Sequence, residues 1–224
     1  MNGSRFPKVL RLIGTFPTAT AINGKHVVTQ APPRSGSSFY NYKKTHSIVL
    51  LAVCIHKYEF TLVSIGDTGR ESDGSVFSAS GIGHSLTNNL LNMPLSRALP
   101  SSTIELLFVI FGDEAFPLRV NMIKPYACGV LDERKRIFNY RLSRAGRVIE
   151  KAFGIMASRF RIFRRPIISS PKKVTPFTKA VVALHNFLIA DNGYCPMGLA
   201  DTDVEEVTGV KTSTDIKVKY QFQE

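Results

Sequence analysis

Two runs of β-forming residues, 47–55 and 60–65, constrain the fold of this chain most. Both are rich in valine, isoleucine and leucine, and a short polar turn around Lys57 separates them. Such a pair of runs predicts a β-hairpin. A further strand is expected over residues 22–30, and the continuous apolar run 103–111 predicts a strand that is covered on both faces.

The second half of the chain has helical periodicity instead. From Ser143 onward, apolar residues recur at three- and four-residue steps, which places them on one stripe of a helix. These residues are Ile149, Phe153, Met156, Phe160 and Phe163. A second helix is expected over residues 176–190, and residues 76–91 are also expected to be helical. Strands early and helices late, around a covered strand, indicate an α/β or α+β fold.

The charge of the chain favours a polyanionic partner. Lysine and arginine total 29 against 17 acidic residues, which gives a net charge of +12. A field of this sign attracts nucleic acid through its phosphates. The cysteines Cys54, Cys128 and Cys195 form no CxxC pair, which argues against a zinc site and a disulfide framework. The longest apolar runs are too short to span a bilayer, so we expect a soluble, intracellular protein.

A single carboxylate stands in the most basic segment. Residues 134–173 contain thirteen lysine or arginine residues and one acidic residue, Glu150. A charge run usually marks a solvated face, and Arg144, Arg147 and Lys151 fall on such a helical stripe, away from the apolar one. A solvated face does not account for Glu150, which is either the centre of a salt-bridge network or a ligand for a cation.

Short motifs along the chain occur in the order found in one family. They are residues 21–27 (Ala-Ile-Asn-Gly-Lys-His-Val), 31–33, 35–37, 39–43, 66–70, 72–74, 112–118 (Gly-Asp-Glu-Ala-Phe-Pro-Leu), 138–144, 150–154 (Glu-Lys-Ala-Phe-Gly) and 184–187 (Leu-His-Asn-Phe). Together they resemble the Harbinger group of DDE transposases and the host nucleases derived from them. The resemblance implies a nuclease domain over residues 16–190, after an N-terminal remnant over 1–15 and before a polar C-terminal tail over 191–224.

The resemblance also implies a fold and a set of site residues. The fold is an α/β, ribonuclease H-like one, in which a mixed sheet flanked by helices presents three catalytic carboxylates. The first carboxylate position falls on Asn23, the second on Asp113 and the third on Glu150. Asp67 or Asp73 could substitute for the carboxylate missing at Asn23, although loop capping and turn formation is the role we favour for both.

The implied chemistry is hydrolysis of DNA phosphodiester bonds with a divalent cation, Mg²⁺ or Mn²⁺, held by Asp113 and Glu150. Asn23 keeps the shape of aspartate but lacks its charge, so cleavage is expected to be impaired. The alternative is a catalytically silent domain that binds nucleic acid or a partner protein. Contacts with DNA are expected from Arg144, Arg147, Lys151, Arg159, Lys43 and Lys44. The resemblance implies a Myb-like DNA-binding partner and a nuclear location, with the cytoplasm as a second compartment. The short apolar runs predict no membrane association.

Two histidines are expected to have roles outside this chemistry. His26 is an odd number of residues from Asn23, so the alternation of a strand puts the two side chains on opposite faces. His185 lies on an apolar helix and is expected to be a core residue or a hydrogen-bonding residue between helices, and not a metal ligand.

Overall fold

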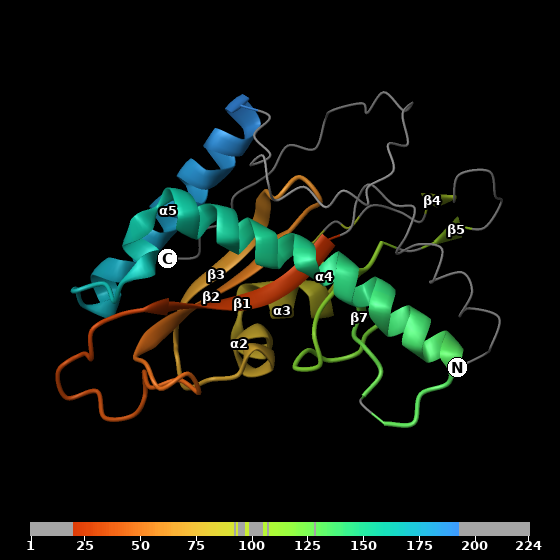
Figure 1. Cartoon of the computed structure of the whole chain (residues 1–224), viewed down its shortest axis with the longest axis horizontal. Helices are drawn as coiled ribbons and strands as arrows, with labels where there is room; N and C mark the ends of the chain where they lie inside the picture. The colour runs from red at the N-terminus through yellow and green to blue at the C-terminus, as the bar shows by residue number, and fades with distance from the viewer. Residues whose placement is uncertain are drawn as a thin grey trace.

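A mixed five-stranded sheet with helices on both faces forms the fold (Figure 1). The computed structural model describes residues 20–91, 93, 97–98, 105–106, 108–127 and 129–192. The strands lie in the order β3 (Phe60–Thr68), β2 (Ser47–Cys54), β1 (Thr20–Val28), β6 (Ile110–Phe111) and β7 (Met122–Ile123). The first three are antiparallel, and β6 pairs in parallel with β1 and β7. This arrangement confirms the predicted α/β class and is consistent with a ribonuclease H-like fold.

An apolar core lies on each face of the sheet, and β2 is therefore buried along its whole length. Successive side chains of a strand point to opposite faces, so β2 contributes to both cores. Leu50 and Ala52 pack with the helices α4 (Glu133–Arg159) and α5 (Pro171–Asn192). On the other face, Val49 and Leu51 pack with the short helices α2 (Asp73–Ala79) and α3 (Gly81–Thr87).

The predicted hairpin is present as β2 and β3, but the apolar run 103–111 is not one strand. Its residues Glu105–Leu106 form β5, which pairs with β4 (Arg97–Ala98) in a separate two-stranded sheet. Only β6 joins the main sheet, where Ile110 and Phe111 pair with the first two residues of β1. The prediction of one covered strand was therefore wrong, since an apolar run alone does not show which partners its residues pair with.

The helices differ from their predicted limits because of their caps. Asp132 caps α4 by accepting a hydrogen bond from the Lys135 amide at 2.8 Å, so this helix begins well before Ser143. It ends at Arg159, and the short 3₁₀ helix η1 (Arg161–Arg164) follows. The helix predicted over residues 76–91 is two helices, because Ser80 ends α2 and its hydroxyl caps α3 at the Gly83 amide, 3.1 Å away.

The predicted N-terminal remnant, residues 1–15, lies outside the described residues, as does the predicted tail beyond Asn192. Among the described residues, no helix combines the length and the apolar content that crossing a membrane requires.

His185 ties α5 to the turn between β2 and β3, as a core histidine. Its side chain is fully buried, and Nε2 lies 2.9 Å from the carbonyl oxygen of Tyr58. Because a carbonyl only accepts, Nε2 carries the proton. Nδ1 is buried without a hydrogen-bond partner among the described residues, which favours the neutral ring. Burial lowers the pKa of His185 most, and nearby Arg159 lowers it further, whereas the hydrogen bond to Tyr58 opposes the shift.

This lowered pKa predicts a loss of stability in mild acid. Protonation is easier in the unfolded chain, so the stability that neutral His185 contributes is present above its unfolded pKa of about 6.5 and is lost as the pH falls below it. Burial lowers the pKa values of His26 and His56 as well, so they act in the same direction. We expect a lower melting temperature at about pH 5.5 than at about pH 7.5, and a smaller difference in His185→Gln. An equal difference in both proteins would contradict the role of His185.

Candidate functional site

The first two predicted site positions lie on neighbouring parallel strands. Ala21 of β1 pairs with Phe111 of β6. Asn23 and Asp113 each come two residues after this pair, so they occupy corresponding positions at one end of the β1–β6 pairing. Ala21 and Val27 pack on the α4 side of the sheet, and strand alternation puts Asn23 on the same side.

Both side chains hydrogen-bond to the backbone beside them. The Asn23 carbonyl Oδ1 accepts a hydrogen bond from the Gly24 amide at 2.7 Å. Asp113 is exposed, and its Oδ1 accepts from the Ala115 amide at 2.8 Å. Within the described part of the chain, no hydrogen bond engages Oδ2 of Asp113. Asp113 therefore has a second, charged oxygen available to a ligand, whereas Asn23 offers a single uncharged ligand oxygen that also accepts from Gly24.

Glu150, the third predicted position, lies on the helix that packs against β1. Figure 1 shows α4 running beside β1 in the same direction. The two elements meet where the Lys25 ammonium lies 5.7 Å from the ring centre of Phe153. Asn23 is two residues before Lys25 on β1, and Glu150 is one turn before Phe153 on α4. Because the two elements run in the same direction, Asn23 and Glu150 lie on the same side of the Lys25–Phe153 contact. Glu150 is exposed, and its side chain forms no hydrogen bond or salt bridge with any described residue.

Asp73 lies closer to this site than the sequence suggested. A side-chain carbon added to Gly24 would be 2.1 Å from Oδ1 of Asp73, so the carboxylate lies directly against the backbone after Asn23. A carbon added to Gly74 would be 2.2 Å from the carbonyl oxygen of Ala115. The first turn of α2 is therefore inserted between β1 and the loop that follows Asp113. Both contacts require glycine, since any other residue would fill the space.

Asp73 was expected to take part in loop capping and turn formation, but it is not the residue that caps α2. Ser72 caps α2, because its hydroxyl accepts a hydrogen bond from the Ser75 amide at 3.2 Å. Burial raises the pKa of Asp73 most, and repulsion from Asp113 raises it further. The Gly24 amide and the Lys43 ammonium have the opposite effect. The two carboxylates are therefore close enough to repel each other.

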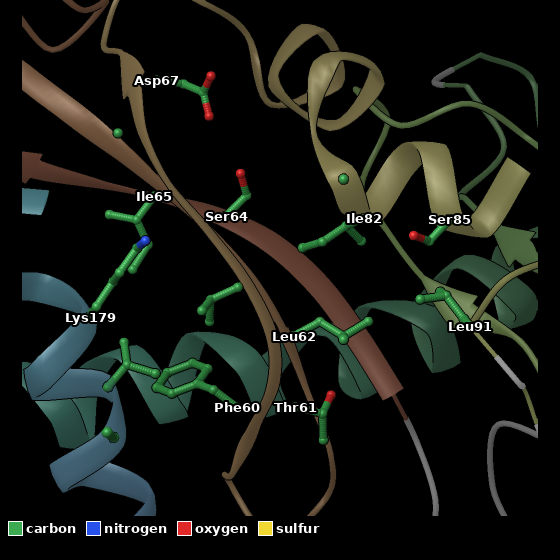
Figure 2. Close-up of a pocket in the computed structure, with 15 residues that line it drawn as sticks. Phe60, Thr61, Leu62, Ser64, Ile65, Asp67, Ile82, Ser85, Leu91 and Lys179 are labelled. Atoms are coloured by element: carbon green, nitrogen blue, oxygen red, sulfur yellow. The ribbon is translucent and has the colours of Figure 1, made fainter. Parts of the chain in front are cut away.

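Asp67, the other possible substitute, is away from this site. It lies on β3, at the edge of the sheet, and burial and Glu71 raise its pKa. It lines a cavity of about 390 Å³ along β3, with Ile82 from α3 and Lys179 from α5 (Figure 2). β2 and β1 separate β3 from β6, so this cavity is not part of the candidate site.

Lys43 lies near Asp73, and Lys25, which was not among the predicted site residues, lies near Lys43. Burial lowers the pKa of Lys25 most, and repulsion from Lys43 lowers it further. Lys43, which was predicted to contact DNA, also lowers the pKa of His26 and of Asp73. The position of Lys25, two residues after Asn23 on the same strand face, was a usable signal. His26 is on the opposite face, as predicted, where Nδ1 lies 2.9 Å from the Ser47 hydroxyl.

The other predicted DNA-contacting residues occupy different environments. Arg144 and Arg147 are exposed on α4, as the solvated stripe predicts, whereas Lys151 is half-buried. Arg159 is also half-buried and lies near His185, at the boundary between α4 and α5. Lys44 is exposed in the turn before β2 and has a positive φ of 60°.

The residues present fit a divalent cation in part. Hard oxygen donors suit Mg²⁺ or Mn²⁺, and the space left by Gly24 brings the carboxylate of Asp73 beside Asn23 and near Asp113. Among the described residues, however, no group of three or more histidine, cysteine, aspartate or glutamate side chains is placed to hold a metal ion. The three predicted positions supply two carboxylates, Asp113 and Glu150, and one amide, Asn23. This set suits a single cation better than the pair of cations that three carboxylates would hold.

One comparison with known proteins assigns these residues to a family. A family model described as DDE superfamily endonuclease matches residues 22–186. The matched range includes Asn23, Asp73, Asp113 and Glu150. None of the curated proteins and none of the solved structures compared with the chain gives a match.

Proposed function

Because the chain belongs to the DDE superfamily endonuclease family, we propose that it is a Harbinger-type, divalent-metal-dependent DNA nuclease whose cleavage is impaired by Asn23. The supporting observation is the placement of Asn23 and Asp113 at corresponding positions on neighbouring strands, beside the helix that carries Glu150. This placement brings the three positions implied by the resemblance to one region of the fold.

The proposed ligands of the cation are Asp113 and Glu150. A bound Mg²⁺ or Mn²⁺ supplies an activated water and charge stabilisation for phosphodiester hydrolysis. Asn23 contributes no negative charge, and its carbonyl oxygen already accepts from Gly24. Two cations close together repel each other, so the loss of one carboxylate weakens the binding of the second ion most. This is the physical reason for the proposed impairment.

The DNA backbone is the proposed substrate contact of the basic side chains around the site. Lys43 lies near Asp73, Lys25 follows Asn23 by two residues on β1, and Arg144 and Arg147 are exposed on α4. Lysine and arginine neutralise phosphates and release their counterions, which favours binding without sequence specificity. The resemblance to Harbinger proteins further favours a nuclear location and a Myb-like DNA-binding partner.

Plasmid nicking in Mg²⁺ and in Mn²⁺ tests this proposal. We expect little or no nicking by the natural chain and an increase of at least about tenfold in Asn23→Asp, the scale on which supporting groups alter metal sites. Adding Glu150→Gln to Asn23→Asp should abolish the gain, because a second ligand is then lost. Asp67→Asn is the matched control, since it removes a carboxylate outside the site.

Two outcomes would contradict the proposal in different ways. Nicking by the natural chain that is lost in Glu150→Gln alone would show that another ligand replaces Asn23, and the claim of impairment would be wrong. A silent Asn23→Asp protein would contradict the nuclease assignment. It would favour the alternative, a domain that binds nucleic acid or a partner protein without cleavage.

A further inference from the structure

The loop that extends from the end of β1 (Figure 1) presents an aromatic ring to solvent. Tyr42 is 79% exposed, yet its ring meets the ring of His26 at a steep angle, with the ring centres 5.5 Å apart. The Lys43 ammonium lies 5.4 Å from the centre of the Tyr42 ring, within the range of a cation–π contact. Exposed side chains usually change rotamer freely, whereas this ring is held by two neighbours.

A buried asparagine fixes the turn that carries Tyr42. Asn41 is 3% exposed, and its Oδ1 accepts hydrogen bonds from the amides of Lys43 at 2.9 Å and Thr45 at 3.1 Å. Its Nδ2 donates to the Ser47 hydroxyl at 2.8 Å, and the same hydroxyl lies 2.9 Å from Nδ1 of His26. A satisfied buried network of this kind makes a loop rigid. One network therefore positions both the turn and the histidine against which Tyr42 packs.

The charge around Tyr42 favours an anionic ligand. Residues 20–58 contain five lysine or arginine residues and no acidic residue. Two of these, Lys43 and Lys44, directly follow Tyr42 and are exposed. A ligand that fits this surface carries negative charge and offers a flat ring for stacking. A nucleotide with an unpaired base has both properties, because the base has a free face and the phosphate binds lysine.

The ring lies within a short distance of the candidate site along β1. His26 is three residues after Asn23, which corresponds to about 10 Å in a strand. This is the length of about three nucleotides in a stacked DNA strand. A base that stacks on Tyr42 therefore belongs to the stretch of DNA next to the bond at the site.

We propose that Tyr42 binds an unpaired DNA base by stacking, so that the chain prefers DNA with unpaired nucleotides beside the bond to be cut. Bases inside a perfect duplex are already stacked on their neighbours and present no free face to Tyr42. This inference rests on the proposed function for the expectation of DNA. It goes beyond that function in the form of the DNA and in the residue that selects it.

DNA binding in EDTA tests the inference without any measurement of cleavage. The probes are a labelled single-stranded oligonucleotide of mixed sequence and the perfect duplex of the same sequence, and fluorescence anisotropy gives each affinity. We expect Tyr42→Ala to lower the affinity for the single strand by at least about tenfold, the scale for the loss of one stacked base. Its affinity for the duplex should stay nearly unchanged.

Three further variants separate stacking from other roles. Tyr42→Phe keeps the ring and should bind the single strand as the natural chain does. Lys44→Gln should weaken the binding of both probes, because phosphates are present in both. Tyr140→Ala is the matched control, since Tyr140 is 60% exposed on α4, outside this loop, and should not alter the affinity for either probe.

A fluorescent residue at position 42 reports the stacking directly. The sequence contains no tryptophan, so Tyr42→Trp places the one indole of the protein at this position. We expect the single strand to quench its emission, because a stacked base quenches indole fluorescence, and we expect the duplex to leave it nearly unchanged. A duplex with one mismatched pair should quench it as well, since the mismatched base unstacks more easily.

Several results would overturn the inference. They are an absence of DNA binding, equal losses for the two probes in Tyr42→Ala, a full loss in Tyr42→Phe, and equal quenching of Tyr42→Trp by the single strand and the perfect duplex. Tyr42 is exposed, so its alanine variant is expected to fold. If its melting curve shows otherwise, Tyr42→Leu takes its place with the same expected loss, because leucine keeps the apolar bulk without an aromatic face.

Failure of this inference and failure of the proposed function are distinguishable. If Tyr42→Ala binds the single strand normally while Asn23→Asp gains nicking, the nuclease assignment stands and Tyr42 is not the stacking residue. If Tyr42→Ala loses the single strand and Asn23→Asp remains silent, the chain binds unpaired DNA without the proposed activity.

Discussion

Replacing Phe116 with alanine is expected to lower the free energy of unfolding by about 4 kcal/mol, the usual cost of removing a buried phenyl ring. The Phe116 side chain is fully buried, and its ring meets that of Phe77 edge to face, with the ring centres 5.7 Å apart. A side-chain carbon on Gly112 would be 2.8 Å from the Phe116 ring, so the ring also packs closely against the backbone before Asp113. Urea unfolding followed by circular dichroism measures the change.

Leu118→Ala is the matched control for Phe116→Ala. Leu118 is in the same loop, but 52% of it is exposed, so its removal should change the free energy of unfolding by less than about 0.5 kcal/mol. Equal effects of the two substitutions would show that the loop after β6 is not anchored by Phe116. The backbone amide of Phe116 also donates a hydrogen bond to the carbonyl of Asp113 at 3.3 Å. Because the buried ring holds this amide in place, its removal should also loosen Asp113.

The sheet was largely predictable from sequence because its signals are local. The strands β1, β2 and β3 follow from alternation and from a run of apolar residues with a short turn between two of them. Pairing between distant segments left no such signal. Ile110 and Phe111 are a strand of the main sheet because they pair with β1 and β7. Residues 105–106, in the same apolar run, pair with β4 instead.

The candidate site illustrates the same limit. Asn23, Asp113 and Glu150 were identified by resemblance, and strand register explains how the first two meet. Asp73 could not be placed by spacing, because its distance from Asn23 depends on how α2 packs against Gly24 and Ala115. A serine and an aspartate before a helix both resemble caps, and only the hydrogen bond of Ser72 separates the two roles.

Asn186→Ala is expected to have the next largest effect on stability, because Asn186 takes the place of a neighbouring strand. Its Oδ1 accepts from the Phe60 amide at 2.9 Å, and its Nδ2 donates to the Phe60 carbonyl at 2.7 Å. β3 is at the edge of the described sheet, so these backbone groups have no strand partner on that side. The side chain of Asn186 therefore satisfies both, as a paired strand would.

Alanine at position 186 would leave the amide and the carbonyl of Phe60 buried and unpaired, each at a cost of about 1–3 kcal/mol. We expect a total loss of about 3 kcal/mol in the free energy of unfolding, measured in urea. Phe187→Ala is the control, because the next side chain along α5 is 65% exposed and should contribute little. Hydrogen exchange at the Phe60 amide should accelerate in Asn186→Ala and stay unchanged in Phe187→Ala. Slow exchange in both would mean that another acceptor protects this amide, and that α5 holds β3 by apolar packing alone.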